Sequence, residues 1–187
     1  KGLVLSDPGW ALEAALDIQW AHAIAPRATI LLVEAKTDEL DAMMEAIDYA
    51  ARRGAAVISN SWGTDEFSGE ERYDKHCRLR SSVCVFASGN SGNPALYPAA
   101  NPYVIAVGGT TLRLTAAGGV IDEVAWRGSG GGVSAYEPKP AYQTTINAFG
   151  GRGAPDVSYN ANPLTGFPVY DSFGYAGQSG WFRLGGT

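Results

Sequence analysis

The sequence predicts an α/β fold in which helices cover both faces of a mostly parallel sheet. Short continuous apolar runs alternate with segments of helical spacing in the first half, which is typical of strands buried on both sides. Hydrophobic residues make up 45% and charged residues 18% of the chain, a composition that indicates a packed globular protein. Neither an internal repeat nor a linker divides the chain, so we interpret residues 1–187 as a single domain.

The first two elements are a helix and a strand. Asp7-Pro8 predicts the helix start, because a capping carboxylate is followed by proline at the first helical position. We expect this helix to end near Ala25, just before Pro26. The continuous apolar run that follows predicts a buried strand over residues 28–35.

A second helix ends at Gly54, and its apolar positions predict one face that packs into the core rather than a cofactor site. These positions are Leu40, Met43, Met44, Ile47 and Ala51. Further strands are predicted over residues 55–59, 82–87 and 103–107, with a short helix around residues 70–79.

The second half of the chain is rich in Gly, Pro, Asn and Tyr, which predicts short strands and long loops. Ala117-Gly118-Gly119 indicates a hairpin near residues 116–120. We expect the loops to lie at the carboxyl ends of the strands, where open parallel sheets place their ligand sites.

Charge and cysteine content exclude several classes of protein. The net charge of −5 and the pI of about 5.0 argue against a nucleic-acid-binding protein. The chain contains no apolar run near the ~20 residues that span a bilayer. Two cysteines and two distant histidines give no zinc-site spacing, so no metal site is predicted within the chain. A disulfide between Cys77 and Cys84 would suit an exported protein and stays open at this point.

The predicted first helix carries two acids, Glu13 and Asp17, four residues apart and therefore on one face. Trp10 and Trp20 share that face. Like charges that lie close together and are poorly solvated raise the pKa of at least one of them, which makes a carboxyl group a useful proton carrier. The alternative is an ordinary helix with two exposed acids.

Two strand ends carry further candidate residues. One strand runs into Ser61-Trp62-Gly63, an extended edge that can pair with a substrate backbone, although a simple strand-end turn fits equally well. Another ends in Asn90, flanked by Gly89, and its amide can donate to a developing oxyanion. A tight turn is again the alternative.

Taken together and in order, these segments resemble the sedolisin family, the serine-carboxyl peptidases built on a subtilisin-like fold. The most specific are YPAANPYVIAVGGTTL (97–112) and the closing GGT. The resemblance covers nearly the whole chain, in residues 11–35, 57–63, 86–92, 97–112, 128–143, 154–172 and 180–187.

The resemblance implies a role for each candidate residue. Glu13 matches the general base for a serine nucleophile, and Asp17 the aspartate that supports it. Ser61-Trp62-Gly63 matches the segment that binds the substrate backbone, and Gly131 and Gly132 lie in the loop that faces it across the cleft. The implied activity is that of a serine-type endopeptidase or tripeptidyl-peptidase acting on peptides or proteins. An acidic optimum is expected, because a carboxylate base has a pKa near ~4 against ~6.5 for imidazole.

The resemblance also implies a secreted protein and a calcium ion in the complete domain, but no cofactor within this chain. We expect the domain to be incomplete here, with its first strands before Lys1 and the nucleophile serine directly after Thr187. This chain alone would then lack peptidase activity, and its partners would include a prosegment or the remaining parts of its own domain. No signal peptide is visible, and one would lie upstream.

Asn90 departs from the family pattern, which typically has an aspartate there. An aspartate must be protonated to donate a hydrogen bond, whereas asparagine donates at every pH. We therefore hypothesise that Asn90 relaxes the acid requirement without abolishing it.

Three other functions are compared with the sequence pattern below. A pseudoprotease that uses the scaffold only to bind peptides or proteins stays an alternative. A Ser-His-Asp hydrolase is disfavoured, because His22 lies off the Glu13 face and His76 lies in a charged stretch. A dinucleotide-binding fold is disfavoured because the glycine clusters at residues 128–132 and 150–153 do not sit between a first strand and a helix.

Overall fold

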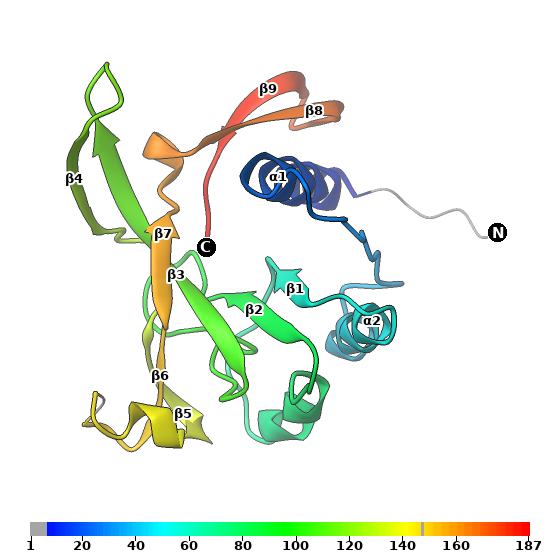
Figure 1. Cartoon of the computed structure of the whole chain (residues 1–187), viewed down its shortest axis with the longest axis vertical. Helices are drawn as coiled ribbons and strands as arrows, with labels where there is room; N and C mark the ends of the chain where they lie inside the picture. The colour runs from blue at the N-terminus through cyan, green and yellow to red at the C-terminus, as the bar shows by residue number, and fades with distance from the viewer. Residues whose placement is uncertain (1–6, 147) are drawn as a thin grey trace.

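A five-stranded sheet organises the computed structural model, which describes residues 7–146 and 148–187 (Figure 1). Strand β3 (Val104–Leu114) pairs in parallel with β2 (Val83–Ala87) and with β7 (Val157–Asn160), and β2 pairs in parallel with β1 (Val57–Asn60). Strand β4 (Val120–Ala125) is the antiparallel member. The predicted mostly parallel sheet with helices is therefore confirmed.

One face of this sheet carries the hydrophobic core. Side chains alternate along a strand, and Ile58, Phe86 and Ala106 point to the same side and are buried. Helix α2 (Leu40–Arg52) covers them with Met44 and Ile47, as its spacing predicted. The opposite face exposes Val57, Val83 and Ile105 by 64%, 43% and 39%, respectively.

The strand predicted over residues 28–35 is not formed. The segment has no strand pairing in the structure, and Ile30, Leu31 and Leu32 are each 39–49% exposed. A strand requires a neighbour that accepts and donates backbone hydrogen bonds, and apolar content alone does not supply one. Among the described residues, β1 pairs only with β2.

Helix α1 (Pro8–Ile24) has the predicted start and end. The carboxylate of Asp7 accepts hydrogen bonds from the amides of Gly9 at 2.7 Å and Trp10 at 3.0 Å, and Ala25 is the C-cap. The helix packs against the hairpin of β8 (Phe167–Tyr175) and β9 (Gln178–Leu184), as Figure 1 shows.

Gln19 and Trp20 fasten α1 to the β8 edge. The Gln19 amide donates to the Tyr170 carbonyl at 2.8 Å and accepts from the Tyr170 amide at 3.0 Å, so it replaces a neighbouring strand residue. The Trp20 indole donates to the Pro168 carbonyl at 3.0 Å, and its ring lies 4.4 Å from that of Phe167. These contacts fix the helix that carries Glu13 and Asp17.

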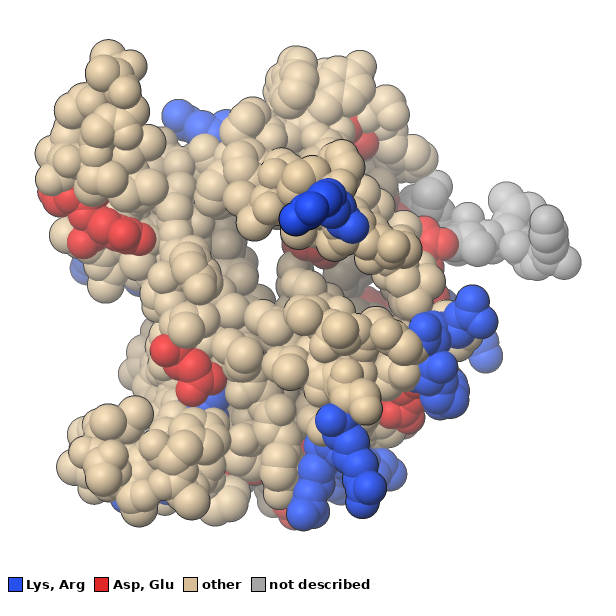
Figure 2. All heavy atoms as spheres, viewed as in Figure 1, with Lys and Arg blue, Asp and Glu red and all other residues tan. Residues whose placement is uncertain are grey.

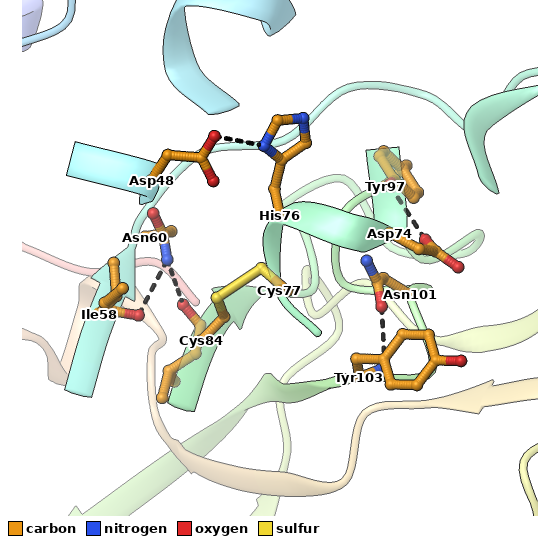
Figure 3. Close-up of a disulfide and its surroundings, with 11 residues drawn as sticks. Asp48, Ile58, Asn60, Asp74, His76, Cys77, Cys84, Tyr97, Asn101 and Tyr103 are labelled. Carbon is orange, nitrogen blue, oxygen red and sulfur yellow. Dashed lines mark hydrogen bonds and ion pairs between the residues drawn. A yellow bond between two sulfur atoms is a disulfide. The ribbon is translucent and has the colours of Figure 1, made fainter. Parts of the chain in front are cut away.

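A disulfide joins Cys77 to Cys84 and closes the possibility that the sequence left open (Figure 3). It links β2 to the 3₁₀ helix η1 (Glu70–His76), which replaces the short helix predicted around residues 70–79. The predicted hairpin is also confirmed, because Thr115 donates to the Gly119 carbonyl at 2.8 Å between β3 and β4.

The remaining elements are short, as the composition of the second half predicted. They are β5 (Gly132–Pro138), η2 (Ala141–Gln143), β6 (Gly151–Ala154) and η3 (Pro163–Thr165). Within residues 7–146 and 148–187, no helix has the length and apolar content to cross a membrane. Figure 2 shows most basic side chains gathered beside α2 and η1, and a hollow between the β8–β9 hairpin and the sheet.

Candidate active site

The two acids of α1 lie beside the carboxyl end of β1. Glu13 and Asp17 are half-buried one helical turn apart, and Ser61 follows β1 directly. The Ser61 hydroxyl donates to the carboxylate of Asp17 at 2.8 Å. The structure therefore brings Ser61 to the carboxyl pair, although Asp17 lies 44 positions before it in the sequence.

The acids of this pair hold protons more tightly than ordinary carboxyl groups. Burial, and then the negative charge of Asp17, raise the pKa of Glu13 to about 7. Burial also raises the pKa of Asp17, while hydrogen bonds from Ser61 and Glu13 act in the opposite direction. Two coupled carboxyl groups of this kind share one proton over a wide range of acid pH.

A cavity of about 750 Å³ opens beside this pair. Its walls include the predicted substrate-binding residues Ser61, Trp62 and Gly63 together with Asn90. Trp62 is anchored edge-to-face on Phe86, with their ring centroids 5.0 Å apart. A cavity of this size is typical of a ligand site.

Asn90 follows β2 and is exposed to the cavity. Its side-chain oxygen accepts hydrogen bonds from the backbone amide of Thr187 at 2.8 Å and from the Thr187 hydroxyl at 3.1 Å. The Thr187 hydroxyl also lies 3.0 Å from the Gly89 amide. With its oxygen engaged by Thr187, Asn90 keeps its NH₂ group available to donate.

Gly131 and Gly132 do not line the cavity but stand beside it. The Gly130 amide donates to the Gly89 carbonyl at 2.7 Å, and the Ser88 hydroxyl donates to the Gly130 carbonyl at 2.7 Å. Gly132 has φ +147°, and a Cβ there would lie 2.6 Å from the side-chain oxygen of Asn93. The backbone therefore approaches closely at the position where the sequence predicted a second wall of the cleft.

Sequence reasoning missed part of the cavity wall. These lining residues come from the start of α2, from the loop after β1, from η1 and from the segment after β2: Asp38, Glu39, Leu40, Met43, Thr64, Phe67, Arg72, Tyr73 and Leu96. Met43, assigned to the core, lines the cavity, whereas Met44 is buried as predicted. The apolar spacing of α2 could have placed Met43 at the edge of the buried stripe, but not beside a cavity.

The two histidines stay away from the carboxyl pair. His76 lies 3.0 Å from Asp48 of α2, and His22 is exposed in the last turn of α1. Across the part of the chain that the structure describes, no group of three or more His, Cys, Asp or Glu residues is arranged to hold a metal ion.

Comparison with known proteins gives consistent matches. The profile of the subtilase family matches residues 9–180. Kumamolisin from Bacillus sp. (strain MN-32) is 34% identical over 190 residues, which cover 84% of this chain and 34% of kumamolisin. Sedolisin from Pseudomonas sp. (strain 101) is 37% identical over 117 residues, which cover 54% of this chain and 20% of sedolisin.

A solved structure of Pseudomonas sedolisin, complexed with two molecules of pseudo-iodotyrostatin, has a similar fold. The TM-score is 0.68 at 28% sequence identity, over 82% of this chain and 50% of that one. The predicted subtilisin-like fold is thereby confirmed. The chain spans about a third or less of the length of these two curated relatives.

Proposed function

Since the chain belongs to the subtilase family and its relatives are sedolisin-type peptidases, we propose that it supplies the base and the oxyanion donor of a serine-type peptidase. One observation carries this proposal. The carboxyl pair Glu13–Asp17 is bound to Ser61 at the rim of a cavity that Asn90 also lines. Acyl transfer requires such a proton acceptor and such a donor on one cleft.

In this proposal Glu13 accepts the proton of a serine hydroxyl, and Asp17 holds Glu13 in place. The pair is active with one proton shared between the two carboxyl groups, because that proton can shift to Asp17 and leave Glu13 free to accept the serine proton. The second proton leaves as the pH passes the raised pKa of Glu13, about 7, so activity is expected on the acid side of neutrality. The burial of the pair supports this acid preference.

Asn90 is proposed to donate its NH₂ group to the oxyanion of the tetrahedral intermediate. Its contact with Thr187 at 2.8 Å means that the residue after Thr187 would begin beside this donor. A serine at that position would then be the nucleophile. The neutral amide of Asn90 needs no proton to donate, which relaxes the acid requirement.

Peptides or proteins are the proposed substrates, bound in extended form between residues 61–63 and the Gly131–Gly132 backbone. The whole protein is proposed to act as an endopeptidase or as a tripeptidyl-peptidase. We further propose that the whole protein is secreted, carries a prosegment and binds a calcium ion outside the described residues.

The experiment is performed on the full-length parent protein. Incubation with a mixed peptide library at pH 4 to 7, followed by mass spectrometry, should reveal cleavage products. A peptide aldehyde should bind covalently and reversibly to the serine that follows Thr187. A parent protein with another residue there, neither cleaving peptides nor trapping the aldehyde, would be a binding scaffold and would refute the peptidase proposal.

A further inference from the structure

A second group of carboxyl side chains lies next to Phe67 and Tyr73, two residues that line the same cavity. Glu70 and Asp74 belong to η1, Glu66 to the loop before it, and Glu137 to β5. We call these four residues the carboxyl clamp. Glu70 is 0% exposed and Glu137 is 2% exposed, so two acids are sealed from solvent.

The clamp joins β5 to the loop that follows β1. Glu66 accepts a hydrogen bond from the Ser134 hydroxyl and another from the Ala135 amide at 3.4 Å. The Ser134 hydroxyl oxygen in turn accepts from the Glu137 amide at 2.8 Å. Strand β5, which begins at Gly132, is therefore held to the loop that follows Gly63.

The same group also contacts a residue of the cavity wall. Glu70 accepts from the Phe67 amide at 2.7 Å, and Phe67 lines the cavity. Asp74 accepts from the Tyr97 hydroxyl at 3.2 Å, and Figure 3 shows this pair beside Asn101. Tyr73, next to Asp74, also lines the cavity. The clamp is therefore part of the backbone segment that carries Phe67 and Tyr73.

Several carboxylate oxygens of the clamp lack a donor. No N–H or O–H group of the described residues donates to either carboxylate oxygen of Glu137 or to one of the two of Glu70. A buried carboxylate without a donor is costly, so the missing donor is best supplied by a carboxyl proton. Glu137 faces Asp74 and Glu70 faces Glu66, which permits one shared proton in each pair.

We propose that Glu70 and Glu137 are positioning residues that clamp β5 to residues 64–76 while they carry protons, and release the substrate cleft when they lose them. This proposal rests on the proposed function only in taking the cavity as the substrate site. It provides a second origin of acid preference, separate from Glu13 and Asp17.

The negative charges around the clamp raise the pKa values of its carboxyl groups. Burial, and then Asp74 and Glu70, raise the pKa of Glu137 to about 8. Burial raises the pKa of Glu70 to about 7 and that of Asp74 to about 6. Glu71 of η1 adds to these shifts.

Arg152, Arg72 and His76, on neighbouring elements, contact groups outside the clamp. Arg152 of β6, the strand paired with β5, is bound to Asp156, and Arg72 stacks on Phe67 and Tyr73. His76 is paired with Asp48, and Lys75 is exposed. Lys139 follows β5, and its backbone amide donates to the Gly150 carbonyl at 3.3 Å.

The sign of the pH effect follows from these shifts. A carboxyl group whose pKa is higher in the folded state stabilises the fold fully below its unfolded value, near ~4.3 for glutamate. That stabilisation is lost as the pH rises to the folded value, about 8 for Glu137. The clamp should therefore weaken between pH 5 and pH 8.

The test compares melting temperatures of the full-length protein at pH 5 and pH 8. All variants carry Glu13→Gln, which suppresses self-cleavage and removes the titration of Glu13, and Asp17 is the same in all of them. Adding Glu137→Gln supplies a neutral, isosteric donor, and we expect the fall in melting temperature to shrink by about 5 °C or more. Glu45→Gln, at an exposed position of α2, is the matched control and should leave the fall unchanged. Parallel curves for the Glu137→Gln and control proteins would overturn the proposal.

Two further measurements keep the outcome decisive. In the native Glu13 background, KM for a cleaved peptide should rise roughly fivefold from pH 5 to pH 8, and less than twofold with Glu137→Gln; an equal rise would refute the link to the cleft. If no peptide is cleaved, hydrogen exchange of residues 130–138 replaces KM. Protection lost at pH 8 only when Glu137 is present supports the clamp, and equal protection refutes it. If Glu137→Gln does not fold, Glu70→Gln is used with the same criteria.

Discussion

The cleft pair and the carboxyl clamp place similar side chains in different surroundings. Glu13 and Asp17 remain half-buried at the rim of the cavity, with a serine hydroxyl as donor. Glu70 and Glu137 are sealed from solvent, and three of their four carboxylate oxygens have no N–H or O–H donor among the described residues. Burial raises the pKa in both groups.

The difference is one of access. A raised pKa makes a carboxyl group a catalyst only where a reacting atom can reach it, and Glu13 lies beside Ser61, which lines the cavity. For the buried Glu70 and Glu137, the same rise in pKa changes the stability of the fold instead, because the proton is taken up on folding. Substitutions in the two groups should therefore change different quantities: turnover for the cleft pair and pH-dependent stability for the clamp.

The largest expected effect is that of Glu13→Gln in the full-length protein. Glutamine cannot accept a proton, so kcat should fall by roughly 10³-fold, within the range that general bases contribute. Steady-state kinetics on a peptide at pH 5 would measure it. Glu45→Gln on the exposed side of α2 is the control. Retention of more than a tenth of kcat would remove Glu13 from the chemistry and end the contrast between the two groups.

The next effect sharpens the contrast by adding a carboxyl group to the cleft. Asn90→Asp should move the alkaline limb of the kcat/KM profile to lower pH, because an ionised aspartate cannot donate to an oxyanion. At pH 7 we expect a loss of roughly tenfold or more, with little loss at pH 4. Asn90→Ala, which removes the donor at every pH, should lower turnover by roughly 10²–10³-fold throughout. Superimposable profiles for the native protein and Asn90→Asp would contradict the role of Asn90.

The sequence foretold the local features of the cleft pair better than those of the clamp. The start of α1 depends on Asp7 and Pro8, which are neighbours, and the spacing of Glu13 and Asp17 sets their common face. The strand predicted over residues 28–35 was wrong, because a strand needs a pairing partner and that partner depends on tertiary structure. For the clamp, Glu66, Glu70 and Asp74 recur every four residues, a signal that was available. Glu137 lies 63 positions beyond Asp74, and nothing local to it indicates burial.

The clamp can be weakened selectively through Tyr97→Phe. This change removes the hydroxyl that donates to Asp74 at 3.2 Å and that lowers the pKa of Asp74. The lost bond favours the ionised form, so the cost should be about 1 kcal/mol at pH 8 and smaller at pH 4. Denaturant unfolding at both pH values measures it, with the exposed Tyr49→Phe as control. A larger loss of unfolding free energy at pH 4 than at pH 8 would show that the bond does not favour ionised Asp74, and would contradict this prediction.

The corresponding change in the cleft, Ser61→Ala, should have the smallest effect. The Ser61 hydroxyl donates to Asp17 at 2.8 Å and lowers the pKa of both Glu13 and Asp17. Without it, both limbs of the kcat/KM profile should move to higher pH by less than about one unit, which corresponds to at most about 1.4 kcal/mol. Ser59→Ala, at an exposed position of β1, should leave the profile in place. Tyr97→Phe and Ser61→Ala each remove one hydroxyl donor from a carboxyl group whose pKa is raised. A change in stability for Tyr97→Phe and a change in the pH profile for Ser61→Ala would separate the two roles. A change in unfolding free energy alone for Ser61→Ala would place the cleft pair with the clamp, as a structural device.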